Sequence, residues 1–135
     1  MDMTRFALAA LAGGFAATFT DWFFFGILFH DKNLAHPEVW RPEIQAGKEK
    51  KAIVISSLFC FVTSAAFVYS AQHLYVTDMN HALKLAAAVW VMIAMPMVVT
   101  NYLFIKLHPA LLVSHSLGWL ARLLVCAVAT ALIVK

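Results

Sequence analysis

Two charged residues stand inside long apolar stretches of the chain, where a charge is costly. Asp21 lies in the apolar run 6–29, and Arg122 lies in the run 110–134. One charge at the centre of a bilayer costs about 2.5–3.5 kcal/mol on insertion scales, so such residues are commonly paired or functional. A carboxylate and a guanidinium are buried at least cost when they neutralise each other. The sequence therefore predicts an Asp21–Arg122 ion pair between the first and the last run.

Further residues are predicted to gather around this pair. At about 1.5 Å per helical residue, the two charges lie roughly 12 and 18 Å from the same membrane face, close enough to meet. Small residues recur at every fourth position before Asp21, which predicts a face where a second helix approaches closely. The predicted stripe is Ala9, Gly13 and Ala17; the other polar members of the centre are Thr63, Ser64, Thr100 and Asn101; and Pro96 is predicted to kink its helix.

Two interpretations of this centre stay open. In the first, the ion pair and nearby hydroxyls fix the register of the helices, since a neutralised pair is the cheapest way to bury both charges. In the second, they form a path for a solute or a proton, with Asp21 as the titratable group and Arg122 as a gate or an anion anchor. We favour the structural interpretation.

A second group consists of four histidines on one side of the membrane. Imidazole and carboxylate groups within residues 30–38 are ligands that zinc accepts, and two facing histidines can hold a haem. However, the spacing matches no helical i, i+4 ligand pair, and histidines at an interface commonly contact headgroups. We therefore predict no metal and no cofactor, and keep only as candidates His30, His36, His108 and His115.

The sequence carries no catalytic motif. A nucleophile elbow, a phosphate-binding loop, a dinucleotide-binding glycine pattern and the common zinc and dithiol motifs are all missing, which favours a non-enzymatic protein. The two cysteines, Cys60 and Cys126, lie inside apolar runs. We interpret the aromatic run 22–25 as packing and an interfacial belt, with a groove for a quinone or an acyl chain as the alternative.

Four apolar helices must position these residues. Of the 135 residues, 63% are hydrophobic and 13% are charged, too few charges to cover a soluble domain. Four runs have the roughly 20 apolar residues that cross a bilayer, and in lipid they must be helical to satisfy their backbone. They are residues 6–29, 52–75, 85–105 and 110–134. We predict one all-α transmembrane domain, residues 1–135, folded as a four-helix up-down bundle.

The connections between the runs differ in length. Residues 79–84 and 106–109 belong to short turns, so the second and third runs, and the third and fourth, are predicted to be antiparallel neighbours. Residues 30–51 form a long connection in which Pro37 and Pro42 break any single helix. Because Trp40 suits the headgroup level, we predict an interfacial segment there.

Basic residues near the run ends predict the orientation in the membrane. Six of them flank the first and third connections, and three lie on the other side, which places the connection 30–51 in the cytoplasm and both termini outside. The six are Lys32, Arg41, Lys48, Lys50, Lys51 and Lys106, and the three are Arg5, Lys84 and Lys135.

Three apolar motifs carry a resemblance to a known family. They are Gly13-Gly14 leading to Trp22-Phe23 and Gly26, then Thr100-Asn101-Tyr102-Leu103-Phe104, and Leu117-Gly118-Trp119-Leu120 with Arg122. On these motifs, most of the chain resembles a family of small four-span bacterial membrane proteins known only as a domain of unknown function. The chain departs from that family in the long connection 30–51. The resemblance implies four helices in an inner membrane, and it implies no activity and no catalytic residues.

Together these observations predict a non-enzymatic membrane module that acts as an oligomer or as a small subunit of a membrane assembly. Its expected partners are the lipid bilayer and either further copies of itself or another membrane protein. A net charge of +3 is too small to predict nucleic acid binding. The alternatives are a transporter or channel for a small solute or ion, centred on Asp21 and Arg122, and a membrane haem or metal protein or enzyme.

Overall fold

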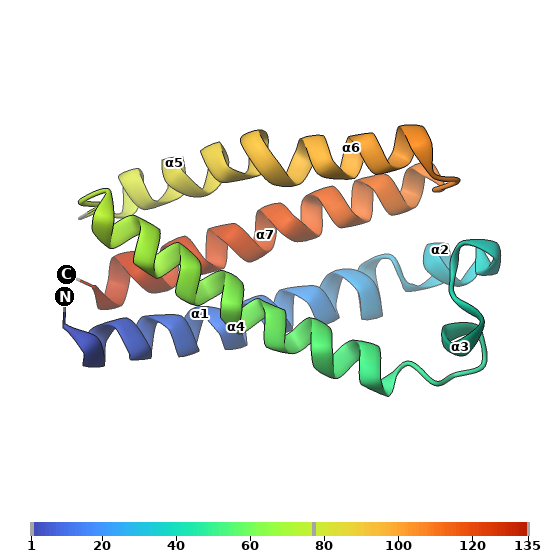
Figure 1. The fold of residues 1–135 in the computed structure, drawn as a ribbon, viewed down its shortest axis with the longest axis horizontal. Coiled ribbons are helices and arrows are strands. Elements are labelled where there is room, and N and C mark those ends of the chain that lie inside the picture. The colour runs from blue at the N-terminus through green and yellow to red at the C-terminus, as the bar shows by residue number, and fades with distance from the viewer. Residues whose placement is uncertain (1, 77, 135) are drawn as a thin grey trace.

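A computed structural model describes residues 2–76 and 78–134, and all the regular elements of that part of the chain are helices (Figure 1). Lys135, counted above for the orientation, lies outside the described residues. Four stretches are long and apolar enough to cross a membrane: Met3–Leu28, Lys50–His73, Met79–Phe104 and Pro109–Ile133. The predicted all-α integral membrane fold is therefore confirmed.

Each predicted run overlaps one of these helices and extends one or two residues beyond its C-terminal end. The first span is α1 (Met3–Phe23) continued by a π-helical turn, η1 (Phe24–Leu28); the second is α4 (Lys50–His73) and the fourth is α7 (Pro109–Ile133). The third span begins at Met79 rather than at residue 85, because Asp78 caps it: Oδ1 of Asp78 accepts a hydrogen bond from the His81 N–H at 3.0 Å. A count of apolar residues alone misses such a polar first turn.

The third span is built from three pieces: α5 (Met79–Val89), a π-helical turn η3 (Trp90–Ala94) and α6 (Met95–Phe104). The π turn is closed by the Met95 N–H, which donates to the Trp90 carbonyl. Pro96 follows at once, and its ring nitrogen has no hydrogen to donate to the preceding turn. The helix thus accommodates Pro96 by widening one turn, and it runs on without interruption (Figure 1).

The first and last spans form the centre of the bundle. α1 packs against both α7 and α4, and α5 packs along α7 (Figure 1). The buried positions of α1 are all small, which lets its neighbours approach closely; they are Ala9, Gly13, Gly14 and Ala17. The predicted small-residue stripe is thus the packing face of the first helix.

One predicted neighbour relation is wrong over most of its length. The third and fourth spans are antiparallel neighbours as expected. The second and third spans meet only near the short turn at residue 76, because α4 crosses α1 and α7 instead of running beside α5 and α6 (Figure 1). The buried side chains of α4, including Cys60 and Ser64, form the face that meets α1 and α7. A short turn brings the ends of two helices together, but their packing faces decide over what length the two helices remain in contact.

The long connection 30–51 folds into three short helices at one end of the bundle: α2 (His30–Leu34), a 3₁₀ turn η2 (Pro37–Val39) and α3 (Pro42–Gln45). Pro37 and Pro42 each open a helix, where a missing N–H costs nothing. The Gln45 side chain donates hydrogen bonds of 2.8 Å to the carbonyls of Pro37 and Trp40. These bonds tie η2 to α3 and hold the connection compact (Figure 1).

Candidate functional site

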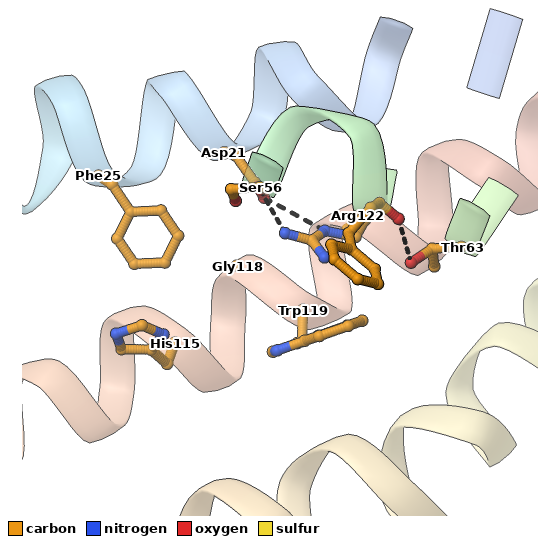
Figure 2. Close-up of a pocket in the computed structure, with 9 residues that line it drawn as sticks. Asp21, Phe25, Ser56, Thr63, His115, Gly118, Trp119 and Arg122 are labelled. Atoms are coloured by element: carbon orange, nitrogen blue, oxygen red, sulfur yellow. Dashed lines mark hydrogen bonds and ion pairs between the residues drawn. The ribbon is translucent and has the colours of Figure 1, made fainter. Parts of the chain in front are cut away.

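Asp21 and Arg122 form an ion pair between the first and last spans. The Arg122 Nε donates to Oδ1 of Asp21 at 3.3 Å, and Nη2 donates to Oδ2 (Figure 2). The side chains are only 14% (Asp21) and 10% (Arg122) exposed. A bidentate contact of this kind fixes both the position and the orientation of the guanidinium relative to the carboxylate. The sequence predicted this pair from the two charges, their depths and the small-residue face that carries Asp21.

Two more side chains contact the pair directly. The Cys60 thiol, on α4, lies 3.4 Å from Oδ2 of Asp21 and donates to it. The Trp119 ring, one turn before Arg122 on α7, lies 4.3 Å from the guanidinium carbon. An aromatic face attracts a cation at this distance. Three helices therefore hold one neutralised pair.

Glycines on two helices allow this close approach. A Cβ added at Gly13 would overlap the Ser64 hydroxyl and lie 3.4 Å from the Cα of Cys126. A Cβ at Gly14 would overlap the Phe61 ring. The backbone of α1 thus meets both α4 and α7 about two turns before Asp21.

A cavity of about 340 Å³ opens beside the ion pair, between α1, α4 and α7. Its walls combine five polar or charged side chains with three aromatic rings and one glycine (Figure 2). The lining residues are Asp21, Phe25, Ser56, Phe59, Thr63, His115, Gly118, Trp119 and Arg122. The two charges therefore lie at the wall of an open space and are not sealed within packed side chains.

One end of the cavity is shaped by the π turn in the first span. The ring of Phe25, within η1, lies 4.8 Å from the ring of His115 on α7 (Figure 2). Gly118 provides room beside it, since an added Cβ would already lie 3.4 Å from Phe25. His115, predicted as one of the metal candidates, faces this cavity instead of another histidine.

The other predicted members of the polar centre have different positions. Thr63 lines the cavity, and its hydroxyl donates to the Phe59 carbonyl at 2.8 Å. Ser64 is buried beside Gly13 and does not line the cavity. The placement of Thr100 and Asn101 at the centre was wrong, because both are exposed on α6 while Ala94 and Val98 form the buried face of that stretch.

The other three candidate histidines lie at the end of the bundle that carries the long connection. The rings of His36 and His108 stack at 3.6 Å and 20°, and His30 is exposed on α2. His36 Nδ1 lies 3.2 Å from the Glu38 carboxylate, whose pKa is held below its usual value by a backbone hydrogen bond and by His36. His108 Nδ1 accepts from the Ala110 N–H and caps α7. In the part of the chain that the structure describes, no three His, Cys, Asp or Glu side chains are arranged to hold a metal ion.

Sequence reasoning missed Ser56, Phe59 and Trp119 as members of the site. A signal for two of them was present in the helical spacing. Ser56 lies four residues before Cys60, and Trp119 lies three residues before Arg122, so each shares a helix face with a residue at the pair. Phe59 likewise lies four residues before Thr63, but it is a large apolar residue that is 60% exposed, and nothing about its type pointed to a polar centre.

The comparison with known proteins identifies a family and no activity. The family model described as a protein of unknown function (DUF1761) matches residues 8–131. No curated protein and no solved structure matches the chain. The match includes all three apolar motifs, the four spans except their outermost residues, and both members of the ion pair. The chain therefore belongs to the DUF1761 family, with four helices fit to cross a membrane and a buried Asp21–Arg122 pair at their centre.

Proposed function

We propose that this protein is a non-enzymatic membrane module that binds a small molecule at the Asp21–Arg122 pair and works as an oligomer or as a small subunit of a membrane assembly. The protein is almost wholly made of membrane-crossing helices, and the described residues outside them form only short helices and turns. A chain of this kind offers little surface outside the bilayer for catalysis or for recognition of a large partner.

The cavity beside the ion pair is the observation that carries this proposal. A pair that served only to hold two helices together would be most stable when packed against side chains on every side. Here Ser56, Thr63 and His115 bring polar groups to an open volume at the same place. This arrangement supports a binding site, in which the pair both holds the helices and contacts a ligand.

Two measurements on the purified protein test the proposal. Light scattering in mild detergent is expected to give a mass above that of one chain, or native mass spectrometry to give a second subunit. Native mass spectrometry is also expected to detect a bound small molecule in the unmodified protein. We expect Ser56→Phe, which fills the cavity, to lose that molecule, and Ser70→Phe, at an exposed position of α4 outside the cavity, to keep it. A clean monomer with no ligand and no partner would overturn the proposal.

The orientation belongs to the same proposal. We place the protein in a bacterial inner membrane with the connection 30–51 in the cytoplasm and both termini outside. The support is the excess of Lys and Arg on the side of that connection, six against three.

Transport of a small solute or an ion is the second candidate. The observation in its favour is that a carboxylate at membrane depth borders an open volume. Since α1 closes against α4 and α7 beyond the pair, around Gly13, a continuous path needs a second copy of the chain. Asp21→Asn should then abolish flux into liposomes while the protein still folds. A variant that retains flux excludes this candidate, and a variant that fails to fold favours a structural role for the pair.

A further inference from the structure

We propose that the cavity takes a neutral, lipid-soluble carbonyl compound, with its carbonyl oxygen on Arg122 and its apolar body toward the bilayer. This inference rests on the proposed binding function and names the class of ligand. Three features of the cavity support it: its net charge, its remaining hydrogen-bond donors and the side on which it opens.

The charge at the site favours a neutral ligand. Asp21 engages Nε and Nη2 of Arg122, so the guanidinium is already neutralised by one carboxylate. A charged ligand would lose its hydration on entering the bilayer and would meet no unpaired charge in return. A neutral ligand avoids that cost, so a free carboxylate or phosphate is not the preferred occupant.

The hydrogen-bond donors at the site favour an oxygen acceptor. Asp21 takes up Nε and Nη2 of Arg122, and no hydrogen bond joins Nη1 to another described residue. Nη1 is not among the enclosed side-chain atoms that lack a partner, and Arg122 lines the cavity, so we take Nη1 to be the donor that a ligand would meet there. Arg offers donors only, so this group needs an acceptor. A carbonyl oxygen, which accepts hydrogen bonds and carries no formal charge, satisfies this donor. Ser56 lines the same space and brings a hydroxyl.

The walls and the opening favour a molecule that arrives from the lipid. Phe25, Phe59 and Trp119 provide three aromatic walls, which suits a flat head of a few ring atoms. On the α4 side, Ser56 is exposed and Phe59 is 60% exposed, so this wall is not covered by another helix. Because α4 crosses the membrane, an opening past these residues leads sideways into the bilayer.

Quenching of tryptophan fluorescence by decylubiquinone tests this inference, because a quinone is a neutral carbonyl compound that quenches an indole it touches. The protein in detergent is titrated with decylubiquinone. We expect a saturable loss of emission in the unmodified protein and in Ser70→Phe. We expect the saturable part to weaken at least fivefold in Ser56→Phe, which fills the cavity, and to be lost in Trp119→Phe, which removes the reporter.

Competition defines what the cavity recognises. An added long-chain ketone, 2-tridecanone, should displace the quinone, whereas tridecane should not, because only the ketone has an acceptor oxygen. Dodecanoate, which is charged, should compete less well than the ketone. Displacement by tridecane equal to that by the ketone, stronger competition by dodecanoate, or non-saturable quenching alike in all variants would each overturn the inference.

The outcome is separable from that of the proposed function. If the purified protein forms an oligomer and carries a bound molecule but shows none of the expected quenching, the ligand class is wrong and the binding module stands. If it shows neither association nor a bound molecule, both proposals fail. Unchanged thermal unfolding of Ser56→Phe is the control that its effect comes from filling the cavity.

Discussion

Two side chains contact the guanidinium of Arg122 within the bundle. Asp21 binds two of its three nitrogens, and the Trp119 ring covers the guanidinium at 4.3 Å. Removal of one member of a buried pair leaves the other charge uncompensated, which costs far more than the pair itself contributes. The two residues should therefore behave as one unit when they are mutated.

The first prediction concerns this unit. Asp21→Asn should destabilise the folded protein by about 3–5 kcal/mol, because it leaves the largely buried guanidinium of Arg122 without a counter-charge. The double variant Asp21→Asn with Arg122→Leu should recover part of that loss, since it buries no charge. Unfolding of the reconstituted protein by a denaturing detergent measures both. If the losses of stability in Asp21→Asn and in Arg122→Leu alone simply add in the double variant, the two residues are not coupled.

Charge, depth and the small-residue face of the first helix were enough to predict the pair, but charge and depth say nothing about rotation around a helix. Thr100 and Asn101 lie at a suitable depth but are exposed on α6. This could not be predicted, because the apolar sequence around them does not indicate which side of the helix faces the bundle. Asp21 was easier, since small residues at every fourth position marked its face. The cavity itself was not predictable, because it depends on how far α4 diverges from its neighbours.

A second prediction concerns Asp78 at the start of the third span. The pKa of its carboxyl lies below the ordinary value of 3.8, chiefly because the His81 backbone N–H donates to it and then because of the His81 side chain. A carboxyl whose pKa is lowered on folding stabilises the protein above its ordinary pKa, and this contribution disappears as the pH falls through the lowered value. Asp78→Ala should therefore reduce the unfolding temperature at pH 7.

Asp78→Asn provides the matched control, because asparagine also caps a helix but carries no charge. The unfolding temperatures of this variant and of the unmodified protein should converge as the pH is lowered toward 3. A difference between the two that stays constant from pH 7 to pH 3 would show that the Asp78 carboxylate contributes nothing through its charge.

At the scale of the elements, close contact between α1, α4 and α7 organises the bundle. Gly13 leaves space for the Ser64 hydroxyl, which is buried and makes no hydrogen bond within the described part of the chain. The packing of three helices at this point therefore depends on a missing methyl group on one helix and a small side chain on the next.

The third prediction tests this contact. Gly13→Ala should destabilise the protein by about 1–3 kcal/mol, because the added methyl group overlaps the Ser64 hydroxyl. Ser64→Ala alone should cost little, since it removes an unpaired buried hydroxyl. The double variant should be more stable than Gly13→Ala alone, as measured by unfolding in detergent micelles. A double variant no better than Gly13→Ala would place the clash at the backbone of Cys126 instead.

The number and approximate limits of the spans could be predicted because lipid imposes length and apolarity on them. The neighbours of the second span could not. The short turn after α4 suggested that it runs beside α5, but in lipid an apolar face gives little preference for one neighbour over another. The small and polar residues of α4 decided the matter, and they face α1 and α7.

At the scale of the whole molecule, the bundle has two unlike ends. One end carries the three short helices of the connection 30–51, together with the turn that joins α6 to α7, and the other carries both termini and the turn that joins α4 to α5 (Figure 1). The cavity extends from the ion pair toward Phe25 and His115, on the side of the long connection. The orientation in the membrane therefore decides which leaflet borders the proposed site.

The fourth prediction tests that orientation. Ala46→Cys and Asn80→Cys place a thiol at exposed positions of opposite ends, and the native Cys60 and Cys126 are buried. A maleimide that cannot cross membranes should label Asn80→Cys in intact cells and should label Ala46→Cys only after the cells are permeabilised. The unmodified protein, with its two buried thiols, is the background control, and the reverse labelling pattern would invert the proposed topology.

The widened turn at Phe24–Leu28 has a consequence for sequence length. A regular helix rotates every following side chain by about 100° when one residue is deleted, whereas a π turn holds one residue more than an α turn does. Deletion of a single residue between Phe24 and Leu28 can therefore restore an ordinary helix without turning Phe29 and the segment beyond it away from the bundle. Insertions and deletions that distinguish natural variants of the first span should concentrate at this turn, and deletion of Phe25 itself would remove that wall of the cavity while leaving Asp21 in place.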